Sequence, residues 1–199
     1  MKRHLGTDYG GWTIDIDDVK DGDTVLDLGL GEDISFSQEL AALRKVNIIG
    51  VDPTEKSHKY VESLPQSPLT LIKKAVVKDG IETITMRKNR NPSHVSESFL
   101  SGHNSVGDDS YEVDGVSIKQ LRDLHPNISL IKMDIEGGEY DVIDECLGIQ
   151  QLCIEFHHFC IDGIAISDTN NCIKKLLDNG YEILDKNAQA TEFTFQLKQ

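Results

Sequence analysis

An α/β fold built on a doubly wound, mostly parallel sheet is what the sequence predicts. First, short apolar runs alternate with segments of helical periodicity from residue 24 onward, a pattern typical of a parallel sheet with helices on both faces. Second, several runs end in glycine, aspartate or histidine, which places flexible and polar residues where the strands stop. Third, the chain of 199 residues is long enough to bury a core without disulfides or a structural metal. We therefore expect one domain over residues 1–199.

The first half of the chain supplies three predicted parallel strands and two helices. The strands are predicted at residues 24–28, 47–51 and 69–77, and the helices at residues 35–45 and 56–64. The second strand stops at Asp52-Pro53, because proline lacks the N–H that would continue a ladder. Lys73 and Lys74 interrupt the third strand. Residues 81–87 alternate between apolar and polar side chains, which predicts an added antiparallel strand.

A polar segment at residues 88–110 separates the two halves of the chain. Structureless loops of this length are uncommon in compact domains and often form lids, although a disordered insertion has the same composition. After it, the predicted elements are a helix at 118–124 capped by Ser117, a strand at 128–133, a helix carrying Tyr140 and Leu147, a strand at 151–156, a helix that starts at Ser167 or Asp168 and ends at Asn179-Gly180, and an antiparallel pair at 181–184 and 193–197.

Charge and hydropathy narrow the range of partners. Lys and Arg number 20 against 34 Asp and Glu, which gives a formal net charge of −14. Such a chain is poorly suited to nucleic acid or anionic membranes, because both are bound through Lys and Arg. No apolar run approaches the about 18 residues of a membrane span, and the N-terminus carries no secretory signal. We expect a cytoplasmic protein with four free, buried cysteines, at positions 146, 153, 160 and 172, and the sequence leaves its oligomeric state open.

The strand ends carry the residues that predict a ligand site. Ligands of doubly wound sheets bind outside the carboxyl ends of the strands, where these ends meet at one edge. Gly29 and Gly31 stand between the first strand and its helix, and glycine lets a backbone approach a ligand closely. Asp52 comes directly after the second strand, about 20 residues after Gly31. At this place a carboxylate can accept hydrogen bonds from the hydroxyls of a ribose. This pattern predicts a nucleoside-containing cofactor.

The glycine turn also indicates which cofactor fits. The third glycine of a dinucleotide fingerprint would fall at Ile34, and Glu32 and Asp33 would repel a pyrophosphate. A nucleoside with a positive centre and an amino group fits better, and S-adenosylmethionine is such a ligand. An NAD-dependent oxidoreductase is therefore the weaker enzyme alternative. A nonenzymatic module that binds adenosylmethionine or a nucleotide is the alternative from another class.

Residues 131–140, Ile-Lys-Met-Asp-Ile-Glu-Gly-Gly-Glu-Tyr, resemble the Lys-x-Asp-x-Glu-Gly-x-Glu signature of the FkbM family of S-adenosylmethionine-dependent methyltransferases. Other segments that resemble the family lie at residues 6–12, 29–36, 51–54, 91–96 and 154–158. The resemblance implies a class I methyltransferase fold, a Rossmann-like seven-stranded sheet whose last strand is antiparallel. It also implies O-methylation of a hydroxyl on a sugar or a polyketide-like product. Residues 1–22 would form an N-terminal approach segment, and residues 88–110 a loop on the substrate side.

The resemblance also implies which residues hold the cofactor. Gly29, Gly31 and Glu32 would line its methionine part, Asp52 would hold the ribose, and Ala75 with Val76 would border the adenine. Many family members have a small residue where this chain has Leu30, so the resemblance implies the fold but leaves the exact path of the loop open. The full set expected to bind the cofactor is Gly29, Gly31, Glu32, Asp33, Asp52, Pro53, Ala75 and Val76.

Four residues at the ends of the fourth and fifth predicted parallel strands are the candidates for catalysis: Asp134, Glu136, His157 and His158. Methyl transfer to an alcohol needs alignment of the oxygen with the methyl group, and a base that accepts the hydroxyl proton helps. Adjacent strand residues point to opposite faces, so at most one of the two histidines is expected to face the site. For Glu139 we favour a simple interaction with the positive end of a helix dipole.

A divalent metal is the other use these residues could have. Asp134, Glu155 and His157 could bind one, but no spacing signature supports this, so no metal ligand is assigned and metal dependence stays open.

The acceptor is expected to be a small molecule or oligosaccharide that enters beneath the 88–110 loop. His94 and Ser96 are the candidates for contact with it, while a solvated side chain is the expectation for His103. We therefore predict a methyltransferase that modifies a hydroxyl of a carbohydrate.

Overall fold

A seven-stranded sheet forms the centre of the computed structural model, which describes residues 1–198. Its strand order is β11-β12-β10-β9-β3-β4-β5. Five neighbouring strands are parallel, and β12 runs antiparallel to both β10 and β11. The strands, in chain order, are β3 (Thr24–Leu28), β4 (Asn47–Val51), β5 (Leu69–Ile72), β9 (Ile128–Met133), β10 (Gln151–Glu155), β11 (Tyr181–Lys186) and β12 (Glu192–Leu197). The predicted α/β fold is confirmed, including the antiparallel strand at the end of the chain.

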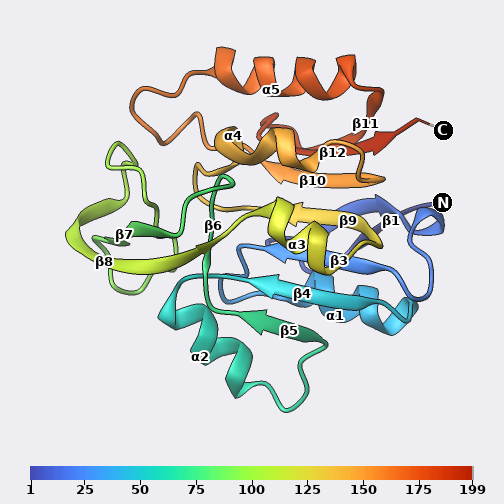
Figure 1. Cartoon of the computed structure of the whole chain (residues 1–199), viewed down its shortest axis with the longest axis horizontal. Helices are drawn as coiled ribbons and strands as arrows, with labels where there is room; N and C mark the ends of the chain where they lie inside the picture. The colour runs from blue at the N-terminus through green and yellow to red at the C-terminus, as the bar shows by residue number, and fades with distance from the viewer. Residues whose placement is uncertain (199) are drawn as a thin grey trace.

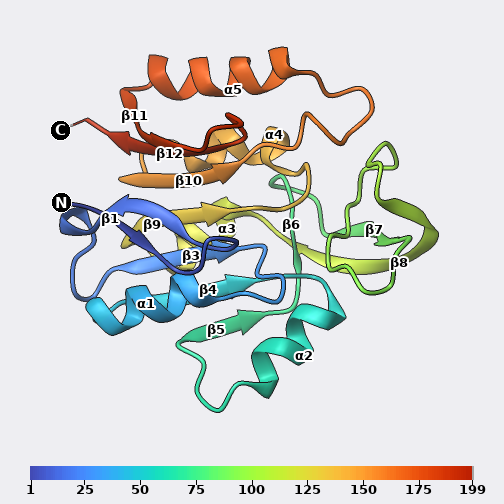
Figure 2. The ribbon, with the colours of Figure 1, turned by 180° about the vertical axis from the view of Figure 1, so that it is seen from behind.

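Helices cover both faces of this sheet. They are α1 (Ser35–Leu43), α2 (Glu55–Ser63), α3 (Ile118–Leu124), α4 (Glu139–Val142) and α5 (Ile166–Asp178), with short 3-10 turns η1 (Ile16–Asp18) and η2 (Ile143–Cys146). Figure 1 shows α3 and α4 on the face toward the viewer, and Figure 2 shows α1 on the opposite face. Two helix ends match their sequence signals. Ser117 and Gln120 form a reciprocal capping box at the start of α3, and Gly180 follows α5 with a φ of 90°.

The core is divided by the sheet in the way that strand alternation dictates. Successive side chains of a strand point to opposite faces, so Val25 packs toward α1 while Leu26 packs toward α3 and α4. The neighbouring strand β9 repeats this division with Leu130 and Ile131. Because both faces are buried, these strands read as continuous apolar runs, and this is why the sequence identifies them.

Two regions of the sequence fold differently from the prediction. The N-terminal segment forms a hairpin of β1 (Lys2–Leu5) and β2 (Trp12–Asp15), which was not expected. The predicted strand at 69–77 divides at Lys73, so that β6 (Ala75–Val76) joins a separate sheet. Lysine at both positions 73 and 74 would be hard to bury in a central sheet, and the chain leaves the sheet there.

The predicted loop at 88–110 is shorter than expected, because its two ends, residues 88–89 and 106–110, belong to the strands of a hairpin. β7 (Thr83–Asn89) pairs antiparallel with β8 (Val106–Val116), and β8 also pairs in parallel with β6. Most of β8 is exposed or half-buried, so it lacks the apolar alternation that marks a strand in a sequence. We call β7, β8 and the connection 90–105 the arm.

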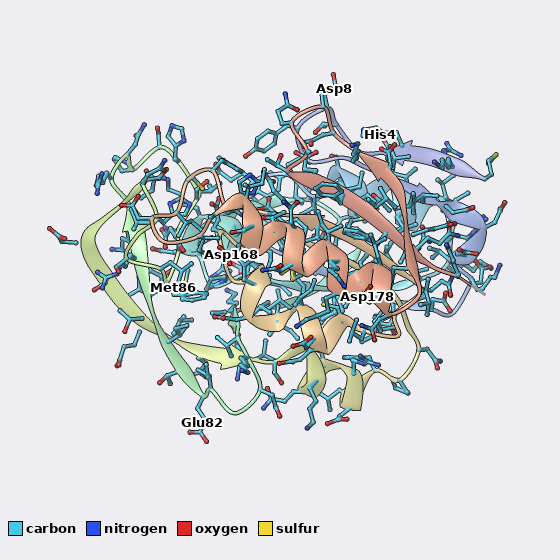
Figure 3. The ribbon with its side chains drawn as sticks, turned by 90° about the horizontal axis from the view of Figure 1, so that it is seen from above. His4, Asp8, Glu82, Met86, Asp168 and Asp178 are labelled. Carbon is cyan, nitrogen blue, oxygen red and sulfur yellow. The ribbon has the colours of Figure 1, made fainter. Side chains whose placement is uncertain are left out.

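The arm projects beyond the carboxyl ends of the parallel strands, on the side opposite to both chain termini (Figures 1 and 2). Seen from above, Asp8 on the β1–β2 turn and Glu82 just before β7 lie on opposite sides of the molecule (Figure 3). Of the helices within residues 1–198, none is long and apolar enough to cross a membrane. The four cysteines are free, and all but the half-buried Cys160 are buried.

Candidate active site

A cavity of about 550 Å³ opens at the carboxyl ends of the parallel strands. This volume lies within the roughly 300–1,000 Å³ that is usual for small-molecule and cofactor sites. The β1–β2 turn (residues 8–12), the strand ends and the arm all contribute to its wall. The cavity therefore lies where ligands of doubly wound sheets bind.

The floor of the cavity is a close backbone contact between β3 and β9. Gly29 has a φ of 80°, and a Cβ at this position would lie 1.7 Å from the carbonyl oxygen of Asp134. Both the dihedral angle and the lack of space require glycine here. The glycine turn and the segment that carries Asp134 are thus fixed relative to each other.

Lys132 fastens the same two strands from within. Its ammonium donates a hydrogen bond to the carbonyl of Gly29 and lies 3.2 Å from the carboxylate of Asp27, which is itself buried. The Ser37 hydroxyl donates to the other oxygen of Asp27 at 2.6 Å. Lys132 is part of the signature at residues 131–140, but its role was not predicted from the sequence. A lysine inside a central strand is a signal of a buried ion pair.

Asp52 organises the turn that follows β3. One of its carboxylate oxygens accepts from the backbone N–H of Leu30 at 2.8 Å and of Gly31 at 3.3 Å. The other accepts from the backbone N–H and the hydroxyl of Thr54, both at 2.7 Å. Asp52 is 4% exposed and lines the cavity. Its side chain shapes the glycine turn from the end of β4.

Asp33 holds the N-terminal segment over the cavity. Its carboxylate accepts from the hydroxyl of Thr7 at 2.5 Å and from the backbone N–H of Ser35 at 2.8 Å. The Thr7 oxygen in turn accepts from the backbone N–H of Gly10 at 3.0 Å. The predicted approach segment therefore contributes residues 8–12 to the cavity wall.

The acceptor-side cluster, as we name it, consists of Asp134, Glu136 and His157. The Nε2 atom of His157 lies 3.5 Å from Oδ1 of Asp134 and 3.5 Å from Oε2 of Glu136. All three residues line the cavity. The prediction that these side chains meet at the ends of two neighbouring strands, β9 and β10, agrees with the structure.

Glu139 supports this cluster from the protein side. It is fully buried, and its carboxylate accepts from the backbone N–H of Ile135 at 2.9 Å and of Gly137 at 3.0 Å. The same carboxylate lies 3.1 Å from Nδ1 of His157. The expectation of a simple helix-dipole interaction was therefore too narrow, because α4 is one turn long and the carboxylate binds specific donors.

The arm reaches the cluster through His103, which was expected to be solvated and is instead 3% exposed. Its Nδ1 accepts from the backbone N–H of Ser105 at 3.2 Å, so that Nε2 carries the proton and donates to Glu136 at 2.9 Å. The Ser98 hydroxyl donates to the backbone carbonyl of Glu136 at 2.7 Å. Both contacts hold Glu136, a non-glycine residue with a φ of 54°.

Burial and charge shift the pKa values in this region. Burial raises the pKa of Asp134 to about 6 and that of Glu155 to about 8. Burial opposes the charged form of His157, yet the carboxylates of Glu139, Asp134 and Glu136 outweigh it and raise the imidazole pKa well above its ordinary value. For Glu136, burial is again outweighed, here by the His103 hydrogen bond and His157, and the pKa is lowered. Such a concentration of perturbed groups in a cavity is typical of a functional site.

The structure separates the predicted site residues into two groups. The cavity wall contains Gly29, Gly31, Asp33, Asp52, Pro53, Ala75, Val76, Ser96, Asp134, Glu136 and His157. Three predicted residues lie outside it. Glu32 and His94 are exposed, and Nδ1 of His158 lies 2.9 Å from the Thr169 hydroxyl, so only one of the two adjacent histidines faces the cavity.

Comparison with known proteins identifies the family. Residues 17–183 match the family model described as the Methyltransferase FkbM domain. No curated protein matches the chain. Among solved structures, the chain is similar to a fibrillarin/Nop5p complex (TM-score 0.54, 10% identity, 91% of this chain and 75% of that one) and to the fibrillarin pre-rRNA processing protein of Methanococcus jannaschii (TM-score 0.51, 10% identity, 89% and 67%).

A third similar structure is the precorrin-6y C5,15-methyltransferase of Geobacter metallireducens (TM-score 0.47, 10% identity, 91% of this chain and 85% of that one). At these identities the structural likeness concerns the fold, which is that of class I methyltransferases. The family match covers most of the chain and includes every residue of the acceptor-side cluster. The chain therefore belongs to the FkbM family of S-adenosylmethionine-dependent methyltransferases.

Proposed function

We propose that this protein transfers the methyl group of S-adenosylmethionine to a hydroxyl of a neutral carbohydrate. The observation that carries the proposal is the acceptor-side cluster, two carboxylates and an imidazole that face one cavity next to the glycine turn. A hydroxyl acceptor must lose its proton during transfer, and such groups accept protons. Membership of a methyltransferase family favours this activity over the oxidoreductase and the nonenzymatic module.

The residues opposite the cluster fit the cofactor. Gly29 and Gly31 both have positive φ, and a Cβ at Gly31 would meet only the Val95 side chain, at an ordinary contact distance of 3.6 Å. Asp52 would hold the ribose hydroxyls, which must replace some of its present donors because a carboxylate has about four acceptor positions. Ala75 and Val76 offer an apolar border for the adenine.

The chain's own groups would position the acceptor and receive its proton. Held by the glycine turn and Asp52, S-adenosylmethionine would supply an electrophilic methyl group to the acceptor oxygen and would keep the electron pair of the broken carbon–sulfur bond on sulfur. The hydroxyl proton would pass to a carboxylate oxygen of Asp134, which lies beside His157. The Gly29–Asp134 contact keeps cofactor and acceptor residues at a fixed spacing, which alignment requires.

Polar and aromatic residues at the mouth of the cavity support a carbohydrate acceptor. Ser96, Asn104 and Ser105 of the arm offer side chains that donate and accept hydrogen bonds, as sugar hydroxyls require. Two cavity-lining aromatics, Tyr9 and Phe159, are 82% and 57% exposed. Flat, exposed rings suit the apolar faces of a pyranose. The net charge of −14 favours a neutral acceptor over a polyanion.

A methyl-transfer assay over a panel of acceptors tests the proposal. The protein is incubated with S-adenosylmethionine carrying a labelled methyl group and, in parallel, with neutral methyl glycosides, neutral oligosaccharides, acidic oligosaccharides and RNA. The expected result is label in a neutral saccharide, held as a methyl ether at a former hydroxyl that makes the adjacent diol resistant to periodate. Label in RNA or in the acidic saccharides alone would overturn the assignment of the acceptor, and labelling of an amine would overturn O-methylation.

A further inference from the structure

We propose that Asp134, Glu136 and His157 bind a divalent cation of the Mn²⁺ type on the acceptor side of the cavity. One ligand atom from each of the three residues lies within 4.8 Å of the other two. The proposal rests on the proposed function only in placing the acceptor at this side, since the cation would bind to the protein alone. From the sequence, Asp134, Glu155 and His157 were considered as possible metal ligands. The site proposed here has Glu136, on the same turn as Asp134, in place of Glu155.

The distances at the cluster suit a cation better than direct hydrogen bonds. His157 Nε2 lies 3.5 Å from both Asp134 Oδ1 and Glu136 Oε2, whereas N–H···O bonds usually span about 2.7–3.2 Å. An ion with bonds of about 2.1 Å to octahedral ligands holds neighbouring ligands about 3 Å apart. A contraction of about half an ångström would therefore bring the His157 nitrogen to the spacing of a neighbouring ligand from each of the two carboxylate oxygens.

His157 is presented as a metal ligand would be. Its side chain is 95% buried (5% exposed), its Nδ1 faces the buried carboxylate of Glu139 at 3.1 Å, and its Nε2 makes no hydrogen bond within residues 1–198. Nε2 is the ring nitrogen next to the cavity-lining carboxylates of Asp134 and Glu136, at 3.5 Å from each. A carboxylate that holds one ring nitrogen of a histidine and fixes its tautomer is the usual outer partner of a metal-bound imidazole.

Glu136 has an outer partner of its own. The backbone N–H of Ser105 fixes the His103 tautomer, and the resulting Nε2–H donates to the Glu136 carboxylate at 2.9 Å. Ser98 holds the backbone of the same residue through its carbonyl. Two of the three proposed ligands are therefore oriented by buried groups before any ion arrives, which is what a built site requires.

The donor set indicates the kind of ion and its use. Two carboxylate oxygens and one imidazole nitrogen suit Mn²⁺ and Mg²⁺ more than soft metals, because no thiolate belongs to the set. Three protein ligands leave coordination positions for water and for the acceptor hydroxyl. An oxygen bound to the cation would be oriented toward the methyl group and would lose its proton more readily. The competing explanation is a protonated His157 held among the three carboxylates without any ion.

Binding of Mn²⁺ alone to the protein separates these explanations. Free Mn²⁺ is followed by electron paramagnetic resonance while MnCl₂ is added to the wild type and to the variants Asp134→Asn, His157→Gln and Glu139→Gln. Asp141→Asn and Glu112→Gln, at exposed carboxylates on α4 and the arm, are the matched controls. Circular dichroism of each variant shows whether it is folded.

We expect one Mn²⁺ per chain in the wild type and in both controls. Loss of a direct ligand in Asp134→Asn or His157→Gln should weaken binding by more than about 100-fold, and loss of the outer partner in Glu139→Gln by about 10- to 100-fold. In the wild type, paramagnetic broadening should be strongest for the ring signals of His157 and His103 and weak for His4 and His125. This second measurement needs no variant.

Equal Mn²⁺ affinity in the wild type and the ligand variants would overturn the site, because the ion would then be held by the acidic surface. Absence of binding at millimolar Mn²⁺, or uniform broadening of all histidine signals, would overturn it as well. These outcomes leave the methyl-transfer assay untouched. Conversely, a bound Mn²⁺ in a protein that methylates no hydroxyl would reject the proposed function and keep the cation site.

Discussion

Nδ1 of His157 and Oε1 of Glu139 lie 3.1 Å apart, although 18 residues separate them in the chain. The contact joins the end of β10 to the turn after β9, and neither side chain is exposed to bulk solvent. The Glu139 carboxylate also closes its own turn through two backbone N–H groups. One buried side chain therefore sets both the shape of the turn that carries Asp134 and Glu136 and the orientation of the imidazole that faces them.

Glu139→Gln tests this positioning. The amide keeps the shape of the side chain but loses the charge and one acceptor oxygen, so we expect methyl transfer to fall about 10- to 100-fold. Affinity for S-adenosylhomocysteine, measured by calorimetry, should stay within about twofold, because Glu139 does not touch the cofactor side of the cavity. Asp141→Asn, two residues further along α4 and exposed, is the control. A parallel loss of cofactor affinity and turnover would show a general structural role instead.

Breaking the buried pair Lys132–Asp27 on one side only should strongly destabilise the protein. Lys132→Met leaves the Asp27 carboxylate buried without its cation, which costs about 3–5 kcal/mol in the free energy of unfolding. The double variant Lys132→Met/Asp27→Asn should recover most of this loss, since no uncompensated charge remains. Urea denaturation measures both. The exposed pair Lys174–Asp178 is the control, and Lys174→Met should barely move the midpoint. If the double variant were as unstable as the single one, charge burial would not be the cause.

Asp52→Asn should weaken cofactor binding more than it weakens the fold. A carboxylate that accepts from ribose hydroxyls contributes roughly 1.5–3 kcal/mol, which corresponds to about a 10- to 150-fold loss of affinity. Part of this loss would come from distortion of the glycine turn. The Asp52 carboxylate accepts from the backbone N–H groups of Leu30 and Thr54, and the amide nitrogen of asparagine cannot accept from either. Calorimetry with S-adenosylhomocysteine is the measurement, and exposed Asp123→Asn is the control. Unchanged affinity in a folded Asp52→Asn protein would remove this residue from the cofactor site.

Glu97 predicts a pH dependence of stability. Burial raises the pKa of this half-buried carboxyl, which also accepts from the hydroxyl of Tyr111 at 2.7 Å. The folded state therefore holds the proton more tightly than the unfolded state. The unfolding free energy contributed by Glu97 falls as the pH rises from the ordinary glutamate pKa through the raised one, and is constant above it.

Glu97→Gln removes this titration and keeps an acceptor for Tyr111. The stability of the variant relative to the wild type should rise across the same pH window, as urea denaturation at mildly acidic and at neutral pH would show. Exposed Glu112→Gln on the same arm should give no such trend. A constant difference between Glu97→Gln and the wild type at both pH values would contradict the prediction.

The sequence was informative wherever burial is complete on both faces. The strands of the large sheet and the capping box at Ser117 were predictable, because apolar runs and local hydrogen-bond partners are visible in the linear order. β8 was not, since an exposed strand held by cross-strand pairing resembles a polar loop. The interruption at Lys73 and Lys74 was expected, but the pairing of Ala75 and Val76 with a second sheet was not.

The site was predictable to the extent that it follows from strand ends. Asp134, Glu136 and His157 come from two neighbouring strands, and parallel topology alone brings them together. His103 could not be found in this way, because its contact with Glu136 depends on how the arm folds back over the edge of the sheet. Glu139 is part of the signature, but a carboxylate at the start of a helix is usually explained by the helix dipole. Its contact with His157 was therefore not predicted.

The connection within the arm is fastened through different groups along its length. Ser98 and His103 bind the Glu136 turn, and the backbone N–H of Asn104 donates to the carbonyl of Cys160 at 2.8 Å. The exposed residues 91–94 are held from outside the arm through their backbone, where the carbonyls of Pro92 and His94 accept from the Lys56 ammonium of α2. Natural variation or directed evolution at these outer positions is therefore uncoupled from the groups that carry out the chemistry. A library randomised at residues 91–94 should change neither folding nor methyl transfer by much, which makes this short stretch the place for a label or tether that must not disturb the cavity.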